Sequence, residues 1–371
     1  MSRSCPFVSR LRGIIQPTYP LPLNETMHKI PVTVITGFLG AGKTTLVRHL
    51  LQNNEGRRIA VLVNEFGEVG IDGDLLRSCQ VCDDEDDPHT NIVELTNGCL
   101  CCTVQEEFYP TMQELLKRRD RLDCILIETS GLALPKPLIQ AFRWDDIRNA
   151  ATVDGVITVV DCDALAAGTL VGDLDALEAQ RQADPNLDHE TPIEELFEDQ
   201  LACADMVLLT KTDSVDAATA AKTQTWLQSQ IPAGVKIVPC GHGQIDANVL
   251  LGFNAAVEDQ LDQRPSHHDH EGEHDHDDEI NAVQWVCDRP LDPVALLDHL
   301  QTLVQQHEIY RIKGFVAVPN KPMRLVVQGV GNRFDSFYDR RWHEGEPHQT
   351  RLVIIGRELV EAEIVRSLEA I

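Results

Sequence analysis

The stretch that determines the fold is "GFLGAGKT", Gly37 to Thr44, which matches the pattern G-x-x-x-x-G-K-[ST]. It follows a short β-branched run, "PVTVIT" at 31–36, and it opens a helical pattern that extends from Lys43 to about Gln52. Strand, glycine loop and helix in this order are typical of a phosphate-binding loop, whose backbone N–H groups surround the phosphates of a nucleotide. In such a loop Lys43 would reach the β- and γ-phosphates, and Thr44 would place its hydroxyl on Mg²⁺. A chance glycine-rich turn is the alternative, but it would not need the flanking strand and helix.

Further apolar runs indicate a layered α/β domain around this loop. They lie at 58–63, 123–128, 155–161 and 206–210, and helical stretches at 106–118, 135–142, 190–203 and 215–229 separate or follow them. Continuous apolar strands alternating with helices predict a mostly parallel sheet that is covered on both faces. After an acidic, histidine-rich tract the pattern changes to short strands with two helices. The predicted order is a disordered extension (1–28), a P-loop domain (29–255), a linker (256–280) and a small α+β domain (281–371).

Composition excludes several classes of function. The chain has 371 residues and a net charge of −27, so its surface repels nucleic acid and anionic membranes and tolerates cations. No apolar run reaches the length of a spanning helix. Eleven cysteines favour free thiols or metal ligands in a reducing compartment, so we expect a cytoplasmic protein. Folded sequence begins close after Met27, which is an alternative translation start to Met1.

Two further candidate nucleotide-site motifs lie at the ends of later predicted strands. "ILIETSG" at 125–131 ends a buried strand in Glu128, a carboxylate that could hold the Mg²⁺ shell or orient an attacking water. Its alternative role is to cap the next helix. "LLTKTD" at 208–213 places Lys211 beside a purine face and lets Asp213 accept two hydrogen bonds from guanine. This pattern favours GTP over ATP, although Thr210 stands where many GTPases have asparagine.

Three thiols lie within four positions in "NGCLCC", residues 97–102. Cys99, Cys101 and Cys102 cannot form an unstrained disulfide framework among themselves, but they can present soft ligands to one tetrahedral cation, zinc or cobalt(II). Metal-free thiols or core cysteines are the alternatives. The segment "NEFGEVGIDG" at 64–73 adds acids, including Glu68, at the place where P-loop GTPases usually keep a nucleotide-sensing switch.

Two further segments carry weaker metal signals. Cys79 and Cys82 form a single C-x-x-C before "DDEDD", which is as consistent with a solvated loop as with a metal site. "HHDHEGEHDHDD" at 267–278 holds five histidines among carboxylates. It could collect cations loosely, or it could be a solvated acidic linker.

Taken together, "TGFLGAGKTTL", "NEFGEVGIDG", "ELTNGCLCC", "IETSGLALP" and "TKTD" occur in an order that resembles the CobW-type metal-handling P-loop GTPases. The resemblance extends from about residue 30 to 371 and is strongest to the members linked to cobalamin biosynthesis. It implies that Gly37, Gly40, Ala41, Gly42, Lys43, Thr44 and Thr45 bind phosphates and Mg²⁺, that Lys211 and Asp213 read guanine, and that Cys99, Cys101 and Cys102 bind metal, with Glu68 as a further metal ligand.

The function implied is a GTP-hydrolysing metallochaperone that delivers a divalent metal, with cobalt(II) for cobalamin biosynthesis as the first expectation. Its partner would be a cobaltochelatase or another client metalloenzyme, which we also expect to accelerate hydrolysis because no arginine finger is evident in cis. A zinc chaperone of the same family and a non-catalytic metal buffer remain alternatives. A homodimer is compatible with the sequence but is not required by it.

Overall fold

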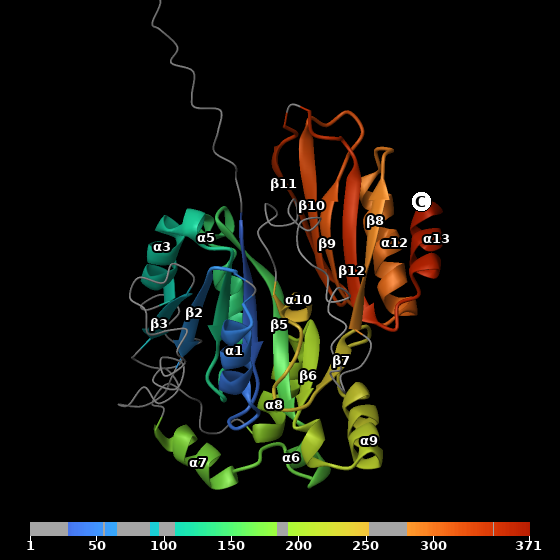
Figure 1. Cartoon of the computed structure of the whole chain (residues 1–371). Coiled ribbons are helices and arrows are strands. Elements are labelled where there is room, and N and C mark those ends of the chain that lie inside the picture. Colours follow the sequence, from blue (N-terminus) through green and yellow to red (C-terminus); the bar gives the residue numbers. More distant parts are fainter. Residues whose placement is uncertain are drawn as a thin grey trace, which may run out of the picture.

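The structure is a computed structural model that describes residues 29–54, 56–64, 90–95, 108–183, 192–251, 280–343 and 345–371. They form two domains that lie against each other (Figure 1). The N-terminal domain is built on a seven-stranded sheet of order β3-β2-β4-β1-β5-β6-β7, in which every pairing is parallel. Its strands are β1 (Ile30–Thr36), β2 (Ile59–Asn64), β3 (Thr90–Leu95), β4 (Cys124–Glu128), β5 (Ala151–Asp161), β6 (Met206–Thr210) and β7 (Lys236–Cys240).

Helices cover both faces of this sheet, as the continuous apolar strands predict. Alternate residues of the strands whose side chains are described enter cores on opposite faces, so that Val159 packs on one side and Val160 on the other. One face is covered by α1 (Lys43–Gln52) and α10 (Ala247–Leu250). The other carries α3 (Tyr109–Lys117), η2 (Arg119–Arg121), α4 (Pro135–Ala141), α5 (Asp145–Arg148), α6 (Cys162–Ala166), α7 (Leu174–Ala183), α8 (Ile193–Ala202), η3 (Thr212–Ser214) and α9 (Ala217–Gln228).

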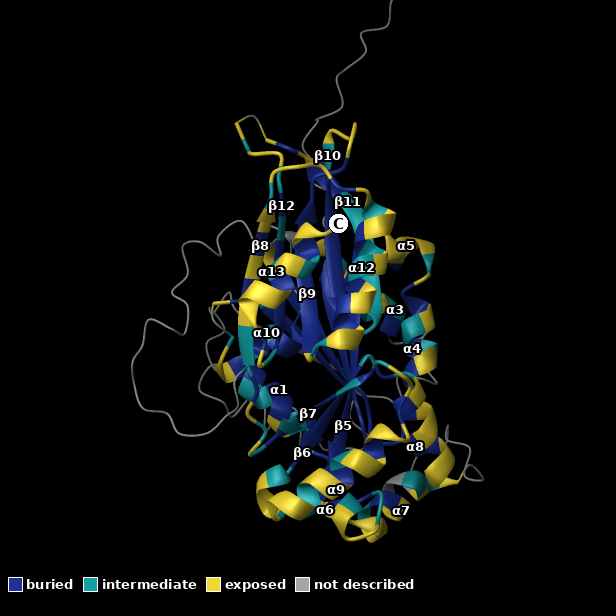
Figure 2. Ribbon diagram, turned by 90° about the vertical axis from the view of Figure 1, so that its right-hand side faces the viewer, coloured by how far each residue is buried: buried dark blue, intermediate teal, exposed yellow. Residues whose placement is uncertain are grey.

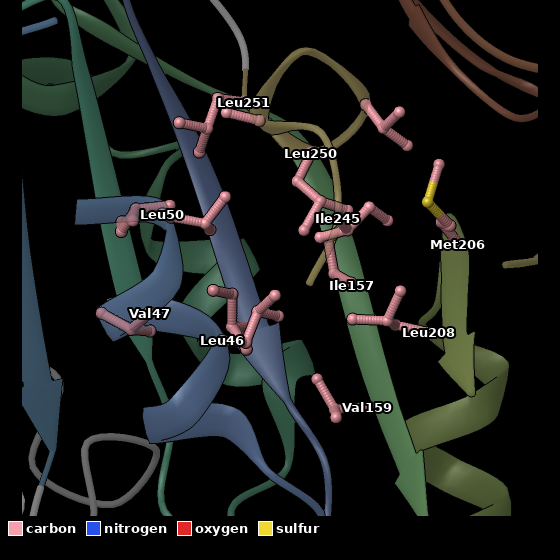
Figure 3. Packing of buried hydrophobic residues seen from close by; sticks show 14 of the residues in the cluster. Leu46, Val47, Leu50, Ile157, Val159, Met206, Leu208, Ile245, Leu250 and Leu251 are labelled. Atoms are coloured by element: carbon pink, nitrogen blue, oxygen red, sulfur yellow. The ribbon is translucent and has the colours of Figure 1, made fainter. Parts of the chain in front are cut away.

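The α1 face illustrates how the core is filled. Leu46, Val47 and Leu50 of α1 lie over Ile157 and Val159 of β5, with aliphatic residues of the 245–251 segment beside them (Figure 3). The helix repeat of 3.6 residues puts positions 46, 47 and 50 on one stripe, which is the stripe that is buried. This packing fixes the helix that begins directly after the glycine loop.

The C-terminal domain is a five-stranded antiparallel sheet of order β11-β10-β9-β12-β8 with two helices on one face. Its elements are β8 (Ile280–Cys287), α12 (Pro293–Gln306), β9 (Ile309–Val316), β10 (Met323–Val330), β11 (Arg333–Arg341), β12 (Thr350–Arg357) and α13 (Glu361–Glu369). The α+β prediction for this region is confirmed, but β11 was not predicted. Figure 2 shows its buried strands behind the exposed outer faces of α12 and α13.

The two domains share one core. Tyr310, Val330 and Ile355 of the C-terminal domain belong to the same buried cluster as α1 and β5. A Cβ at Gly155 of β5 would lie 3.2 Å from a methyl carbon of Val330, so the strands approach closely there. Asp154 of β5 forms a buried ion pair with Arg311 of β9. Strand β5 of the parallel sheet is therefore also a main contact with the C-terminal domain.

Candidate functional site

The glycine loop joins β1 to α1 at the carboxyl edge of the parallel sheet. Gly37 has a φ of +135°, and a Cβ there would lie 2.2 Å from the carbonyl oxygen of Val159. Gly42 is the N-cap of α1, with a φ of 98° and a ψ of 19° in the left-handed region. Both positions demand glycine, because a side chain would clash or would force a strained backbone. The loop therefore has the tight course that allows backbone N–H groups to approach a phosphate.

Lys43 is the first residue of α1, and its side chain folds back across the loop. Its Nζ donates hydrogen bonds to the carbonyl oxygens of Gly37, at 2.8 Å, and Phe38, at 3.0 Å. The ammonium is thus held inside the loop by the backbone that a phosphate would also contact. From this position a lysine can neutralise phosphate charge with little rearrangement.

Thr44 and Glu128 meet behind the loop. The Thr44 hydroxyl donates to Glu128 Oε1 at 2.8 Å, and the Glu128 side chain is only 3% exposed. The next helix, α4, begins at Pro135 with Leu134 as its N-cap and no side-chain cap, so Glu128 does not cap it. A hydroxyl beside a carboxylate offers the oxygen ligands that Mg²⁺ prefers, and the residues present therefore fit this ion.

The loop after β4 closes against the glycine loop. A Cβ at Gly131 would lie 2.6 Å from the backbone nitrogen of Leu39, which leaves room only for glycine. Gln200 of α8 is fully buried, and its Nε2 donates to the carbonyl oxygens of Gly131, at 3.2 Å, and Ala133, at 3.1 Å. Gln200 was not predicted as a site residue, because nothing local in α8 links it to a loop almost seventy residues earlier.

Thr210 is the last residue of β6, and Lys211 follows it at the same edge. The Thr210 hydroxyl is buried and lies 2.7 Å from the carbonyl oxygen of Ala41 and 3.0 Å from that of Val160, so it ties β6 to the glycine loop. Lys211 has a φ of 56°, and its Nζ donates to Asp161 Oδ2 at 2.6 Å. Asp161, the last residue of β5, was not predicted. It holds the ammonium of Lys211 at the carboxyl edge of the sheet.

Asp213 contacts a turn that follows β7. Its Oδ1 accepts the backbone N–H of His242 at 2.9 Å, and its Oδ2 lies 3.1 Å from His242 Nδ1. The hydrogen bond from the His242 backbone is the main cause that lowers the pKa of Asp213 below its usual value. The carboxylate is therefore an anion, and it is 30% exposed.

The predicted transition-metal site lies outside the described residues. This holds for Cys99, Cys101, Cys102 and Glu68, for Cys79 and Cys82, and for the histidine tract. Among the residues that the structure does describe, no group of three or more His, Cys, Asp or Glu side chains could hold a metal ion. Burial raises the pKa of Cys124 to about 12 and also raises those of Cys162 and Cys203, which disfavours the thiolates that bind metals.

The described helices also bear on a membrane location. Within the ranges given above, none combines the length and the apolar character that a transmembrane span requires.

Family models match both domains. Residues 31–239 match the model described as "CobW/HypB/UreG, nucleotide-binding domain". Residues 280–371 match the one described as "Cobalamin synthesis protein cobW C-terminal domain". The first match ends within β7 and the second begins with β8, so α10 lies in the interval between the two matches.

Curated relatives match over almost the whole chain. "Zinc chaperone CobW" of Pseudomonas aeruginosa is 57% identical over 348 residues, which are 94% of this chain and 92% of that protein. A protein of the same name from a Sinorhizobium species is 50% identical, with coverages of 91% and 96%. "Zinc chaperone YjiA" of Escherichia coli is 33% identical, with coverages of 91% and 97%. With both domains matched and relatives of this similarity, the chain belongs to the CobW family of P-loop proteins.

Proposed function

We propose that this chain is a GTP-hydrolysing metallochaperone, which loads a divalent transition metal at Cys99, Cys101 and Cys102 and delivers it to a client. The observation that carries the proposal is the position of Lys43 directly beside the hydrogen-bonded pair Thr44 and Glu128. A protein that only stored metal would need no such arrangement of ammonium, hydroxyl and buried carboxylate. Membership of the CobW family supports the same conclusion.

Each described site residue has a role in this proposal. The backbone of the glycine loop and the Lys43 ammonium bind the β- and γ-phosphates, while Asp213 reads guanine with Lys211 against its face. Thr44, with Glu128 behind it, would hold Mg²⁺, which supplies charge neutralisation across the phosphate oxygens. Glu128 orients a water for attack on the γ-phosphorus. The bond from this phosphorus to the bridging oxygen breaks, and GDP and phosphate are released.

Chain connectivity supports a link between the nucleotide and the metal. β2 ends at Asn64 and β3 at Leu95, and these two residues are paired in the sheet. Both strands are parallel to β1, so their carboxyl ends face the same edge as the glycine loop. Cys99 follows four residues after Leu95. We infer that GTP tightens the thiol site through the 64–73 segment, and that hydrolysis loosens it for transfer.

Two metals compete as the cargo. The names of the relatives from Pseudomonas aeruginosa, the Sinorhizobium species and Escherichia coli support zinc. The description of the C-terminal domain model, a cobalamin synthesis protein, supports cobalt(II) for cobalamin biosynthesis. Thiolates suit both ions, and zinc binds only somewhat more tightly in the usual affinity order. The client is accordingly a cytoplasmic zinc enzyme or a cobaltochelatase, and we propose that it accelerates hydrolysis.

Phosphate release and metal competition test the proposal on the full-length chain. We expect slow release of phosphate from GTP by the wild type and none by Lys43→Ala, since the variant lacks the ammonium that meets the γ-phosphate. Titration with mixed zinc and cobalt(II), read by thiolate-to-cobalt absorption, then identifies the cargo. If the protein hydrolyses no GTP, either by itself or with its client present, the proposal that it is a GTPase is refuted. Displacement of cobalt(II) by zinc at the physiological ratio of the two metals would contradict cobalt delivery and favour zinc as the cargo.

A further inference from the structure

The turn after β7 brings a histidine to the residue that reads the base. β7 ends at Cys240, and the next three residues, Gly241, His242 and Gly243, form the turn. His242 has a φ of 52° and Gly243 a φ of 71°. Two successive residues in the left-handed region reverse the chain sharply, and histidine is among the non-glycine residues that tolerate this conformation best. The turn points the His242 backbone N–H at Asp213.

Neighbours on the other side hold this turn in place. A Cβ at Gly243 would lie 3.0 Å from Thr45 Cγ2 in the first turn of α1. One turn further along α1, His49 Nε2 lies 3.1 Å from the carbonyl oxygen of Ile245 and 3.3 Å from its backbone nitrogen. The turn therefore lies between the helix that follows the phosphate loop and the residue that reads the base, and it has little freedom to move away from either.

His242 contacts both oxygens of the Asp213 carboxylate. The backbone N–H donates to Oδ1, and Nδ1 of the ring lies at hydrogen-bond distance from Oδ2. With its proton on Nδ1 the ring donates to that oxygen. Each carboxylate oxygen accepts about two hydrogen bonds, so the carboxylate can accept further donors besides those of His242. Guanine offers two adjacent donors, N1–H and the 2-amino group, whose spacing matches the two oxygens of a carboxylate.

We propose that His242 is a positioning residue that fixes the carboxylate of Asp213 so that both of its oxygens face the guanine edge. It thereby sets the preference for guanine over purines that lack the 2-amino group. This inference rests on the proposed function, in that Asp213 must read the base. A carboxylate held on one oxygen only could rotate about the Cβ–Cγ bond. It would still accept from N1–H, but the bond to the 2-amino group would be lost for part of the time.

Two variants distinguish the contribution of the His242 ring from that of its backbone N–H. His242→Gly removes the imidazole and keeps the backbone N–H, and glycine adopts the left-handed conformation without strain. His242→Asn keeps a side-chain N–H donor and tolerates the same conformation. Glu358→Gly is the matched control, since Glu358 also has a positive φ, 50°, but lies between β12 and α13 of the C-terminal domain.

The readout is the ratio of the dissociation constants for IDP and GDP, measured by calorimetry on the full-length protein. IDP differs from GDP only in lacking the 2-amino group. We expect His242→Gly to reduce this ratio by about tenfold, chiefly through weaker GDP binding, which is the effect of one charge-assisted hydrogen bond. His242→Asn should restore the ratio to within about threefold of the wild type, and Glu358→Gly should leave it unchanged.

An unchanged ratio in His242→Gly would overturn the inference, and so would an equal fall in Glu358→Gly. Failure of His242→Asn to restore the ratio would also overturn it, because the donor would then not matter. These outcomes differ from a failure of the proposed function. In that case the wild-type protein itself would bind GDP no better than ADP, whatever stands at position 242.

Discussion

The buried ion pair between the domains permits a quantitative prediction. Asp154 of β5 and Arg311 of β9 have side chains that are 0% and 2% exposed. Arg311→Met keeps most of the side-chain volume but leaves the Asp154 carboxylate in a dry interior with its main countercharge removed. The Nη1 donation to the carbonyl oxygen of Val249, at 3.4 Å, is lost as well. We expect Arg311→Met to lower the free energy of unfolding by about 3–5 kcal/mol, the usual cost of breaking a buried pair from one side.

A double variant separates the cost of the lone charge from the worth of the pair. In Asp154→Leu with Arg311→Met both charges of this pair are replaced by apolar groups, so neither partner is left as a lone charge. Such replacements are often neutral or stabilising, and the double variant should be more stable than Arg311→Met by at least about 2 kcal/mol. Arg148→Met is the exposed control. Arg148 pairs with Asp145 at 2.9 Å, but these side chains are 58% and 82% exposed, so the loss should stay below about 1 kcal/mol.

Thermal unfolding by calorimetry and urea denaturation measure these differences. For Arg311→Met we expect one transition, because the domains share a core, with a Tm lower by about 5–10 °C. Nucleotide affinity below the transition reports whether the glycine loop is still formed. The reasoning is refuted if Arg311→Met costs less than about 1 kcal/mol. It is also refuted if the double variant loses as much free energy of unfolding as Arg311→Met and Asp154→Leu, each measured alone, lose in sum.

Three further predictions concern the site. Thr210→Val removes the hydroxyl that bridges β6 and the glycine loop, so GDP affinity should fall by about tenfold in fluorescence titration, and an unchanged affinity would contradict the bridging role. Lys211→Met keeps the aliphatic stem but leaves Asp161 without its ammonium partner, so calorimetry should show a lower Tm together with weaker GDP binding. Cys101→Ala should bind GDP as the wild type does and lose tetrahedral cobalt(II) absorption, whereas retained absorption would remove this thiol from the metal site.

The strands of the sheet differ in how well the sequence predicts them. β1, β2, β4, β5 and β6 are continuous apolar runs because both of their faces are buried, and the prediction places all five. β7, "KIVPC", was missed, since its proline is tolerated only on an edge strand, and edge position is a property of the assembled sheet. β3, at the opposite edge, was missed as well.

β11 was missed for a different reason. Its sequence, "RFDSFYDRR", mixes charged and aromatic residues without a strict alternation, and this resembles a surface loop. In the structure Asp335 accepts a hydrogen bond from Thr152 at 2.9 Å, and Arg333 pairs with Asp205 at 2.9 Å. Both partners belong to the N-terminal domain. Arg333 and Asp335 therefore find their partners in the other domain, and no local pattern contains this information.

The residues of the candidate site also differ in whether neighbouring sequence predicts them. Lys43, Thr44 and Glu128 could be named from motifs, because a phosphate loop and a strand-terminal acid are encoded by neighbouring residues, and the structure brings them together. Asp161 and His242 could not be named, because each acts on a residue that is distant in sequence. Both lie at the carboxyl end of a strand, where parallel sheets gather functional side chains. That position is the signal by which they could have been found. The roles assigned to the thiols at 99–102 stay predictions.

The central claim is that the nucleotide controls metal affinity, and one titration tests it most directly. Zinc and cobalt(II) affinities of the full-length protein are measured by chelator competition, once with a non-hydrolysable GTP analogue and once with GDP. Because coupling is reciprocal, a handover requires binding that is tighter by about a hundredfold in the GTP state, and this is the result that we predict. Equal affinities in the two states would contradict GTP-gated delivery and would leave a metal buffer with a nucleotide-stabilised fold.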